Sequence, residues 1–197
     1  WLQTGSLDTA LTEKQVVFDL WNGELSSSAG YGRIRIEMTG SGAPFLVTVL
    51  SGTTGFHQQS IGSTLTQNSL SDWAHYAFSF VNTDSNIVTR LYHNGELNQT
   101  LTAGTNIGEI REDIEANIGA LVTTPSGNVY HGAAIGEGWG KLSGSIDEFR
   151  FWKTRRTEKQ IKRNYFTNQI GGGTNTDTAN LNLGVYYKFN EGITTNT

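Results

Sequence analysis

Apolar and polar residues alternate with a period of two along much of the chain. The clearest run covers residues 33–38, where isoleucine or methionine occupies every even position and arginine or glutamate every odd one. Residues 16–20, 45–49 and 76–80 carry apolar side chains at every second position in the same way. Side chains of a β-strand alternate between its two faces, so this period predicts strands with one face in a core and the other in water.

Two local signals lie between and after these strands. Asn94-Gly95 matches the two-residue turn of a β-hairpin, which needs positive φ angles that these residue types tolerate. Residues 157–166 are the helix candidate, because Thr157 can cap the first turn and Gln160 stands three positions later, as in a capping box. We expect a tight hairpin at the first signal and a short, peripheral helix at the second.

The last apolar run completes the pattern. We expect one inward face to be formed by Leu183, Val185, Tyr187 and Phe189. Many short strands with one short peripheral helix predict an all-β fold, a two-sheet antiparallel sandwich. A chain of 197 residues is an ordinary length for one such domain.

Composition narrows the class of protein. The net charge is −4, whereas binding to a nucleic-acid backbone needs clustered excess lysine and arginine, so we expect no nucleic-acid partner. The chain has no cysteine, so its stability has to come from its core or from a bound metal. No apolar run reaches the length of about 18 residues that a membrane span needs, and we expect no membrane insertion.

Four segments resemble the laminin G-like, concanavalin A-like sandwich family and follow one another in the family's order. They are Trp73-Ala74-His75-Tyr76-Ala77-Phe78, Leu91-Tyr92-His93-Asn94-Gly95-Glu96-Leu97, residues 144–152 and residues 183–192. The third contains an acidic pair and precedes the helix candidate, and the fourth is a last aromatic strand. The resemblance implies a jelly roll with a concave and a convex sheet, and calcium is a frequent structural companion of the family.

The first residues carry a resemblance of their own. Residues 1–5 resemble the tail of the strand that begins the family's body. We therefore expect residues 1–197 to form a single concanavalin A-like sandwich domain. We also expect it to be an excerpt of a larger modular protein that lacks its first strand or strands.

The same sandwich carries glycoside hydrolases that resemble laminarinase, whose motif Glu-x-Asp-x-Glu places three carboxylates on one face of a strand. Residues 111–115 come close to this motif, but Arg111 stands at the nucleophile position and cannot attack a sugar. Retaining hydrolysis needs two carboxyl groups about 5 to 5.5 Å apart. We interpret the segment as an ion-paired strand edge or turn and expect a protein that is not an enzyme.

Sugar recognition needs flat aromatic faces for the C–H side of the ring and polar planar groups for the hydroxyls. A glycine-rich stretch combines both types of side chain, and its candidate carbohydrate-binding residues are Asn128, Tyr130, His131, Glu137 and Trp139. Trp139 lies between two glycines and is either an exposed stacking platform or a plug over the end of the sandwich. The usual burial of large aromatic side chains favours the plug.

Two further surfaces are candidates for binding. Trp21 with Asn22 and Tyr31 flanks a serine-rich loop. The basic run in residues 153–163 could meet an acidic glycan or an acidic protein, although such a run is usually a solvated helix face.

Asp147 is the candidate metal ligand. Strict alternation would place it on the same face as Phe149 and Phe151, and an acid on a buried face needs a partner. That partner could be a structural calcium ion, an arginine or a backbone amide. The alternatives stay open at this point.

Residues 141–192 resemble modules of very long virion proteins of tailed marine bacteriophages. This resemblance implies a noncatalytic carbohydrate-binding or adhesion module, located on a virion surface or otherwise extracellular. Its partners would be glycans or cell-surface polysaccharide, with other virion proteins as further candidates. The alternative is a structural virion or matrix domain that makes protein contacts and binds no sugar, and an inactive relative of a glycoside hydrolase comes third.

Overall fold

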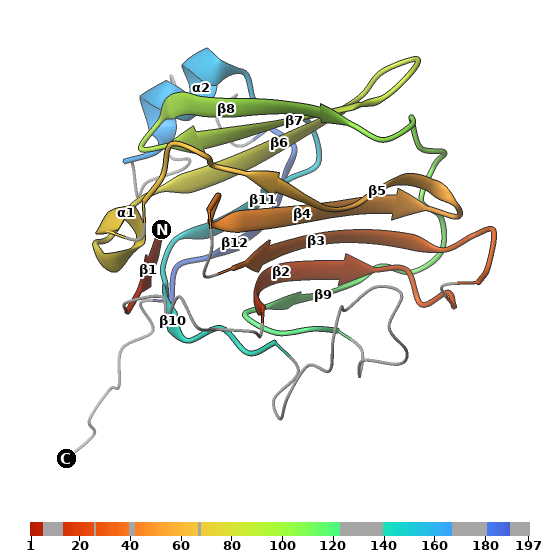
Figure 1. Cartoon of the computed structure of the whole chain (residues 1–197), viewed down its shortest axis with the longest axis horizontal. Coiled ribbons are helices and arrows are strands. Elements are labelled where there is room, and N and C mark those ends of the chain that lie inside the picture. The colour runs from red at the N-terminus through yellow and green to blue at the C-terminus, as the bar shows by residue number, and fades with distance from the viewer. Residues whose placement is uncertain are drawn as a thin grey trace.

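The computed structural model describes residues 1–5, 14–25, 27–39, 42–66, 68–122, 140–166 and 181–189. These residues form antiparallel sheets in two layers, with two short helices, as in Figure 1. The predicted all-β antiparallel sandwich is therefore confirmed. Neither described helix is long and apolar enough to cross a membrane.

The first layer is a five-stranded sheet in the order β5-β4-β3-β2-β9. Its strands are β2 (Gln15–Trp21), β3 (Gly32–Met38), β4 (Phe45–Ser51), β5 (Thr54–Ile61) and β9 (Glu115–Ile118). Most of these strands follow one another as hairpins, whereas β9 returns from the far end of the second layer to pair with β2. The ladder is continuous from one edge of the sheet to the other.

The second layer consists of three separate pieces. A three-stranded sheet contains β6 (Tyr76–Asn82), β7 (Ile87–His93) and β8 (Glu96–Ala103). Two two-stranded pieces are β1 (Leu2–Thr4) with β10 (Gly144–Ile146), and β11 (Phe149–Trp152) with β12 (Leu183–Tyr187). Among the described strands, β6 pairs only with β7 and β11 pairs only with β12.

The predicted short helix and the predicted hairpin turn are both confirmed. Helix α2 (Glu158–Asn164) begins with a capping box, in which the amide of Gln160 donates to the Thr157 hydroxyl and the amide of Thr157 donates to the Gln160 side chain. Asn94 and Gly95 have φ angles of 48° and 81°, as a two-residue hairpin turn requires. A second helix, α1 (Asn68–Ser71), was not predicted, because a single turn is too short to carry a helical period.

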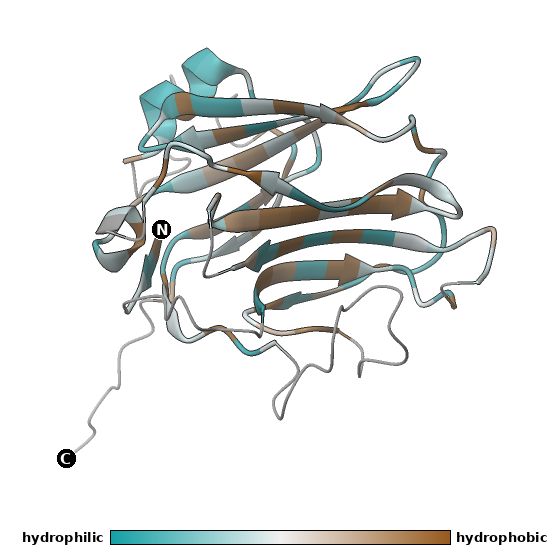
Figure 2. Cartoon of the chain, viewed as in Figure 1, coloured by the Kyte–Doolittle hydropathy of each residue, from teal (hydrophilic) through white to brown (hydrophobic). Residues whose placement is uncertain are grey.

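The core lies between the two layers. Phe45 and Val47 of β4 are completely buried, and Phe45 meets Tyr76 and Phe78 of the opposite layer edge to face. Phe18 of β2 also packs against the second layer, with its ring tilted by 32° and 5.4 Å from the ring of Phe149. Apolar side chains of both layers thus fill the space between the sheets, and β4 is the most uniformly hydrophobic strand in Figure 2.

The prediction that β3 has one face in water is wrong. Its alternation is present in Figure 2, but Arg35 and Glu37 are completely buried and form an ion pair at 3.0 Å. Arg33 is also buried and pairs with Asp19 of β2. Although burial opposes the charged form, this pairing raises the pKa of Arg33. Charged side chains are compatible with a buried face here because opposite charges stand next to one another.

The last strand has the predicted orientation but not the predicted burial. Val185 and Tyr187 of β12 lie directly opposite Phe151 and Phe149 of β11, so they share the face that points toward the core. They are nevertheless 37% and 53% exposed, and Phe189 is 48% exposed. The inward face of β12 is therefore only partly covered.

Candidate functional site

The predicted carbohydrate-binding residues cannot be placed in the fold. Asn128, Tyr130, His131, Glu137 and Trp139 all belong to residues 123–139, which lie outside the described residues. Their role stays a prediction.

Two of the three residues of the second candidate surface are buried, whereas Trp21 is half-buried. Asn22 and Tyr31 are 2% exposed. The Asn22 side chain donates to the carbonyl oxygens of Gly30 and Arg111 and accepts from the amide of Gly32. Asn22 therefore holds the β2–β3 connection and the loop before β9 together, and the expectation that it binds a ligand beside Trp21 is wrong.

Asp147 does not share a face with Phe149 and Phe151 as strict alternation predicted. Ile146 and Phe149 both pack against the core although they are three positions apart, and Glu148 between them has a φ of 54°. An extra residue in a strand, a β-bulge, shifts the alternation in this way. The Asp147 carboxylate is half-buried and accepts from the amide of Glu148 at 2.9 Å.

The Asp147 contact corresponds to the backbone-amide alternative for that carboxylate. Among the described residues, no group of three histidine, aspartate or glutamate side chains is arranged to hold a metal ion. Calcium stays a prediction.

The segment that resembles a hydrolase motif is a turn. Residues 111–114 precede β9, and Glu112 has a φ of 71°, so the segment lacks the alternation that would place its carboxylates on one face. Arg111 pairs with Glu109 at 3.2 Å, and both side chains are about three-quarters exposed to solvent, at 76% and 75%. The interpretation as an ion-paired turn is confirmed.

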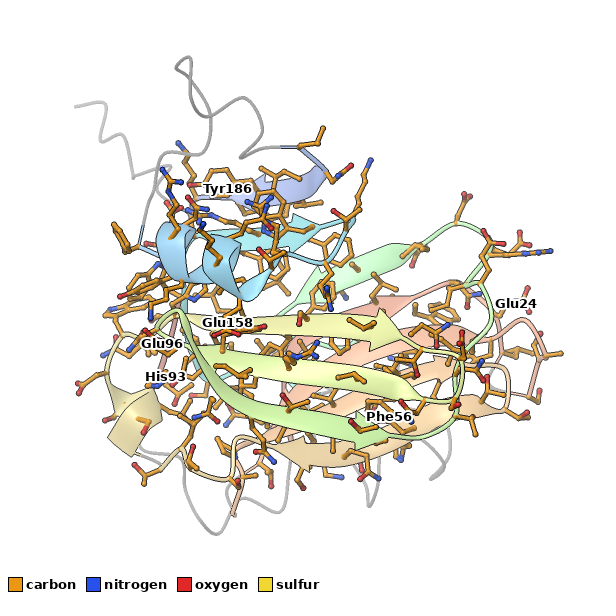
Figure 3. All side chains as sticks on the ribbon, turned by 90° about the horizontal axis from the view of Figure 1, so that it is seen from above. Glu24, Phe56, His93, Glu96, Glu158 and Tyr186 are labelled. Atoms are coloured by element: carbon orange, nitrogen blue, oxygen red, sulfur yellow. The ribbon has the colours of Figure 1, made fainter. Side chains whose placement is uncertain are left out.

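A hollow of about 220 Å³ lies on the outer side of the three-stranded sheet. We call it the arginine pocket, and its lining residues are Arg90, Tyr92, Arg155, Arg156, Thr157 and Glu158. Figure 3 labels Glu158 where α2 begins, beside this sheet. The pocket therefore joins β7 to the segment between β11 and α2.

The alternation of β7 places Arg90 in the pocket. Thr89 and Leu91 are completely buried on the core side of the strand, so Arg90 and Tyr92 point to the opposite, outer side. Tyr92 is itself only 3% exposed and forms the base of the pocket. Arg155 comes from the covering segment and is exposed.

The pocket has an excess of positive charge. It contains the guanidinium groups of Arg90, Arg155 and Arg156 against the one carboxylate of Glu158. Within the described part of the chain, no acidic side chain forms an ion pair with any of these arginines. Guanidinium groups bind carboxylate, sulfate and phosphate through paired hydrogen bonds, so this arrangement suits an anionic group.

Arg156 is held in place by an aromatic ring. Its guanidinium carbon lies 4.1 Å from the centre of the Trp152 ring, within the range of a cation–π contact. Partial burial lowers the pKa of Arg156, yet an arginine keeps its charge in proteins. A guanidinium oriented in this way loses less freedom when an anion binds.

The sequence identified only part of this site. Arg155 and Arg156 belong to the basic run, whose remaining members include Lys162 on the exposed face of α2. Lys162 pairs with Glu96 at 2.5 Å, and both side chains are more than half exposed, at 59% and 63%. Arg90 lies outside the run, and only the packing of the segment after β11 over β7 brings it to the other two arginines.

A family model described as the concanavalin A-like lectin/glucanases superfamily matches residues 1–162. The chain therefore belongs to the concanavalin A-like lectin/glucanase superfamily. That description covers sugar-binding lectins as well as sugar-cleaving glucanases, so membership defines the fold and leaves the activity to the site.

One solved structure is similar to this chain over much of its length. It is an S-layer domain-containing protein (residues 221–444) from Clostridium thermocellum ATCC 27405, with 21% sequence identity and a TM-score of 0.33. The similarity covers 78% of this chain and 64% of that one. No curated protein matches the sequence.

Proposed function

We propose that this protein is a noncatalytic carbohydrate-binding module that recognises an acidic glycan through the arginine pocket. The observation that carries the proposal is the convergence of Arg90, Arg155 and Arg156 on one hollow without ion-pair partners among the described residues. Superfamily membership supports a sugar as the ligand, and the charge of the pocket supports a sugar with carboxylate or sulfate groups.

The geometry suits weak, repeated binding. The pocket is small and open to solvent through Arg155, which is exposed, so each site would hold one acidic sugar unit and would release it readily. A polysaccharide repeats its acidic unit many times, and linked copies of the module would gain avidity from such repetition. The resemblance of residues 141–192 to modules of phage virion proteins supports a virion or cell surface as the location of this binding.

Binding without catalysis agrees with the lining of the pocket. Glycoside hydrolysis by the common mechanisms needs a pair of carboxyl groups on either side of the scissile bond. Glu158 is the one carboxylate that lines the arginine pocket, and it stands at the first turn of α2, where it favours the helix.

A glycan array tests the proposal. The wild type should bind uronic-acid-containing or sulfated bacterial and algal polysaccharides and should leave their neutral counterparts unbound. Arg155→Ala should weaken this binding by about tenfold or more, because a charge-assisted hydrogen bond contributes about 1.5 to 3 kcal/mol. Lys141→Ala is the matched control, since Lys141 is an exposed basic residue outside the pocket.

A second run of the array with a chelator, and the outcome in which no glycan binds, distinguish the alternatives. Binding that disappears with a chelator would support the calcium prediction, whereas unchanged binding would separate the pocket from any metal. Silence across acidic and neutral glycans would contradict the proposal. It would favour a structural domain, for which the exposed apolar face of Val185, Tyr187 and Phe189 is the supporting observation.

A further inference from the structure

The second layer is interrupted between β6 and β11. Each of these strands pairs on one side only among the described strands. A cavity of about 420 Å³ separates them and is lined by residues 76–80 of β6 and 149–152 of β11. We call this cavity the strand slot.

The strand slot is enclosed on its two other sides as well. Phe18, Ile36 and Phe45 line it from the first layer. Ile161 and Tyr165 line it from α2 and the residue after it, and in Figure 3 α2 lies between the β11–β12 pair and the three-stranded sheet. The slot thus has two strand edges as walls, the core as its floor and a helix as its cover.

Strand β1 leads directly into the slot. On one side, Leu2 of β1 is the partner of Ile146 in β10. On the other side, Leu2 exchanges two backbone hydrogen bonds with Ala74, just before β6, at 2.9 and 3.2 Å. β1 therefore already occupies the position between the two halves of the layer, but only at its end.

We propose that the strand slot holds a further antiparallel strand that continues β1 on its N-terminal side. This strand would belong to the polypeptide that precedes Trp1 in a longer form of the protein. It would pair with β6 on one edge and with β11 on the other, and it would join the three pieces of the second layer into one sheet.

The register on the β6 side defines which residues of this strand face the core. The pairing of Leu2 with Ala74 places the first and third residues before Trp1 opposite Tyr76 and Phe78. Tyr76 and Phe78 contact Phe45 in the core, and Leu2 belongs to the same core. The first, third and fifth residues before Trp1 should therefore be apolar.

The register on the β11 side independently predicts the same apolar positions. Trp1 is the partner of Asp147, with which it exchanges backbone hydrogen bonds at 2.6 and 3.0 Å. The bulge at Glu148 inserts one residue, so the first residue before Trp1 comes opposite Phe149, which faces the core. Two walls that were built by different parts of the chain thus require the same alternation.

The other face of the strand meets the cover of the slot. Trp1 lies on this face, where its ring is 5.9 Å from His75 and 6.2 Å from Tyr165. The fourth residue before Trp1 would lie opposite Ser79, whose buried hydroxyl has no hydrogen-bond partner among the described residues. A hydroxyl-bearing residue at this position could provide that partner.

Burial in the slot is incomplete without such a strand. Phe78 and Phe80 of β6 and Phe149 and Phe151 of β11 are all half-buried, although they pack against the core. Phe45 of the first layer, which packs against Phe78, is by contrast completely buried. An inserted strand would cover these rings and would also pair the backbone groups on the open edge of β6.

Two extensions of equal composition test the proposal. One variant carries Thr-Val-Thr-Val-Thr-Val immediately before Trp1, which places valine at the first, third and fifth positions. The control carries Val-Thr-Val-Thr-Val-Thr, which places threonine there. A shift by one residue moves every side chain of a strand to the other face, so only the first variant matches both walls.

Thermal unfolding and hydrogen exchange give the readout. The first extension should raise the Tm by about 5 °C or more over the chain without an extension, since 1 kcal/mol corresponds to about 2 to 4 °C at this chain length. It should also slow amide exchange in residues 76–80 and 149–152 together. The control extension should do neither, and equal effects of the two extensions, or no effect of the first, would overturn the proposal.

Discussion

The two layers of the sandwich differ in continuity. In the five-stranded sheet, β4 has a paired neighbour on both sides, and its core residues Phe45 and Val47 are completely buried. In the second layer, β6 and β11 each have one edge without a paired strand among the described residues, and Phe78 and Phe151 are only half-buried. The difference indicates that burial of an apolar face depends on paired strands on both sides within the layer as much as on the facing sheet.

Charged residues follow the same contrast. The ion pair of Arg35 with Glu37, in the continuous sheet, is inaccessible to solvent, whereas the ion pair of Lys162 with Glu96, beside the second layer, is largely exposed. If the buried pair loses one member, the remaining charge has neither an opposite charge nor water next to it. A charge left over from the exposed pair is still hydrated. Substitutions made in pairs, one in each layer, can therefore measure this difference.

The two layers should differ most when one core phenylalanine is removed from each of them. Phe45→Ala should reduce the free energy of unfolding by about 3 to 5 kcal/mol, because it leaves a closed cavity in the core. Phe151→Ala should cost less than half as much, since its ring is half-exposed and the strand slot is already open beside it. Urea unfolding of both variants measures the two values, and equal losses would contradict the contrast.

Loss of one carboxylate from each ion pair comes next. Glu37→Gln should destabilise the protein by about 3 kcal/mol, because a buried charge is left without its opposite. Glu96→Gln should change the stability by less than about 1 kcal/mol, as is usual for exposed pairs. The same urea measurement applies, and a Glu37→Gln variant as stable as the wild type would show that the buried pair is dispensable.

Stability should depend on pH through His75. Burial, with smaller effects of the nearby positive charges, lowers the pKa of His75 to about 3, from 6.5 in an unfolded chain. Between these two values the unfolded chain binds a proton that the folded chain does not, so stability falls as the pH decreases below 6.5. The contribution is at most about 1.4 kcal/mol per pH unit.

His75→Phe provides the comparison for this pH dependence. Phenylalanine keeps a ring against Trp1 and Tyr165 and carries no titrating group. Chemical unfolding at pH 7, 6, 5 and 4 should give a shallower loss of stability for the variant than for the wild type. Parallel curves would mean that His75 accepts a proton in the folded protein at its ordinary pKa.

The smallest effect is expected at a glycine of the β7–β8 hairpin. Gly95 has a φ of 81°, and an added Cβ would lie 2.4 Å from Cδ1 of Tyr165. Gly95→Ala should therefore destabilise the protein by about 1 to 2 kcal/mol through strain and a shift of the Tyr165 ring. Gly5→Ala is the control, because nothing lies within 4 Å of an added Cβ there and its effect should be near zero.

The sequence predicted features that depend on neighbouring residues and failed where distant segments meet. The capping box of α2 and the Asn94-Gly95 turn follow from a few adjacent residues. The burial of Arg35 depends on a partner two positions away and on what packs over that face, which the alternation of β3 does not contain. The face of Asp147 was wrong for a similar reason, because one bulge residue is invisible in an alternating pattern.

The arginine pocket illustrates the same limit for function. Arg155 and Arg156 stand out in the sequence as part of a basic run, but Arg90 is an isolated charge in an otherwise ordinary strand. Its place in the pocket follows from the antiparallel order of β6, β7 and β8 and from the segment that covers β7. The carbohydrate-binding residues predicted between positions 128 and 139 stay a prediction.

Nuclear magnetic resonance can show whether the arginine pocket recognises an acidic glycan. An oligosaccharide of uronic acids is titrated into isotope-labelled protein, with the neutral oligosaccharide of equal length as the control. If the pocket binds the acidic sugar, amide shifts should cluster at residues 90–92 and 155–158, and they should be absent with the neutral sugar and in Arg90→Ala. Shifts that cluster elsewhere, or no shifts at sugar concentrations in the millimolar range, would rule out the arginine pocket as the binding site.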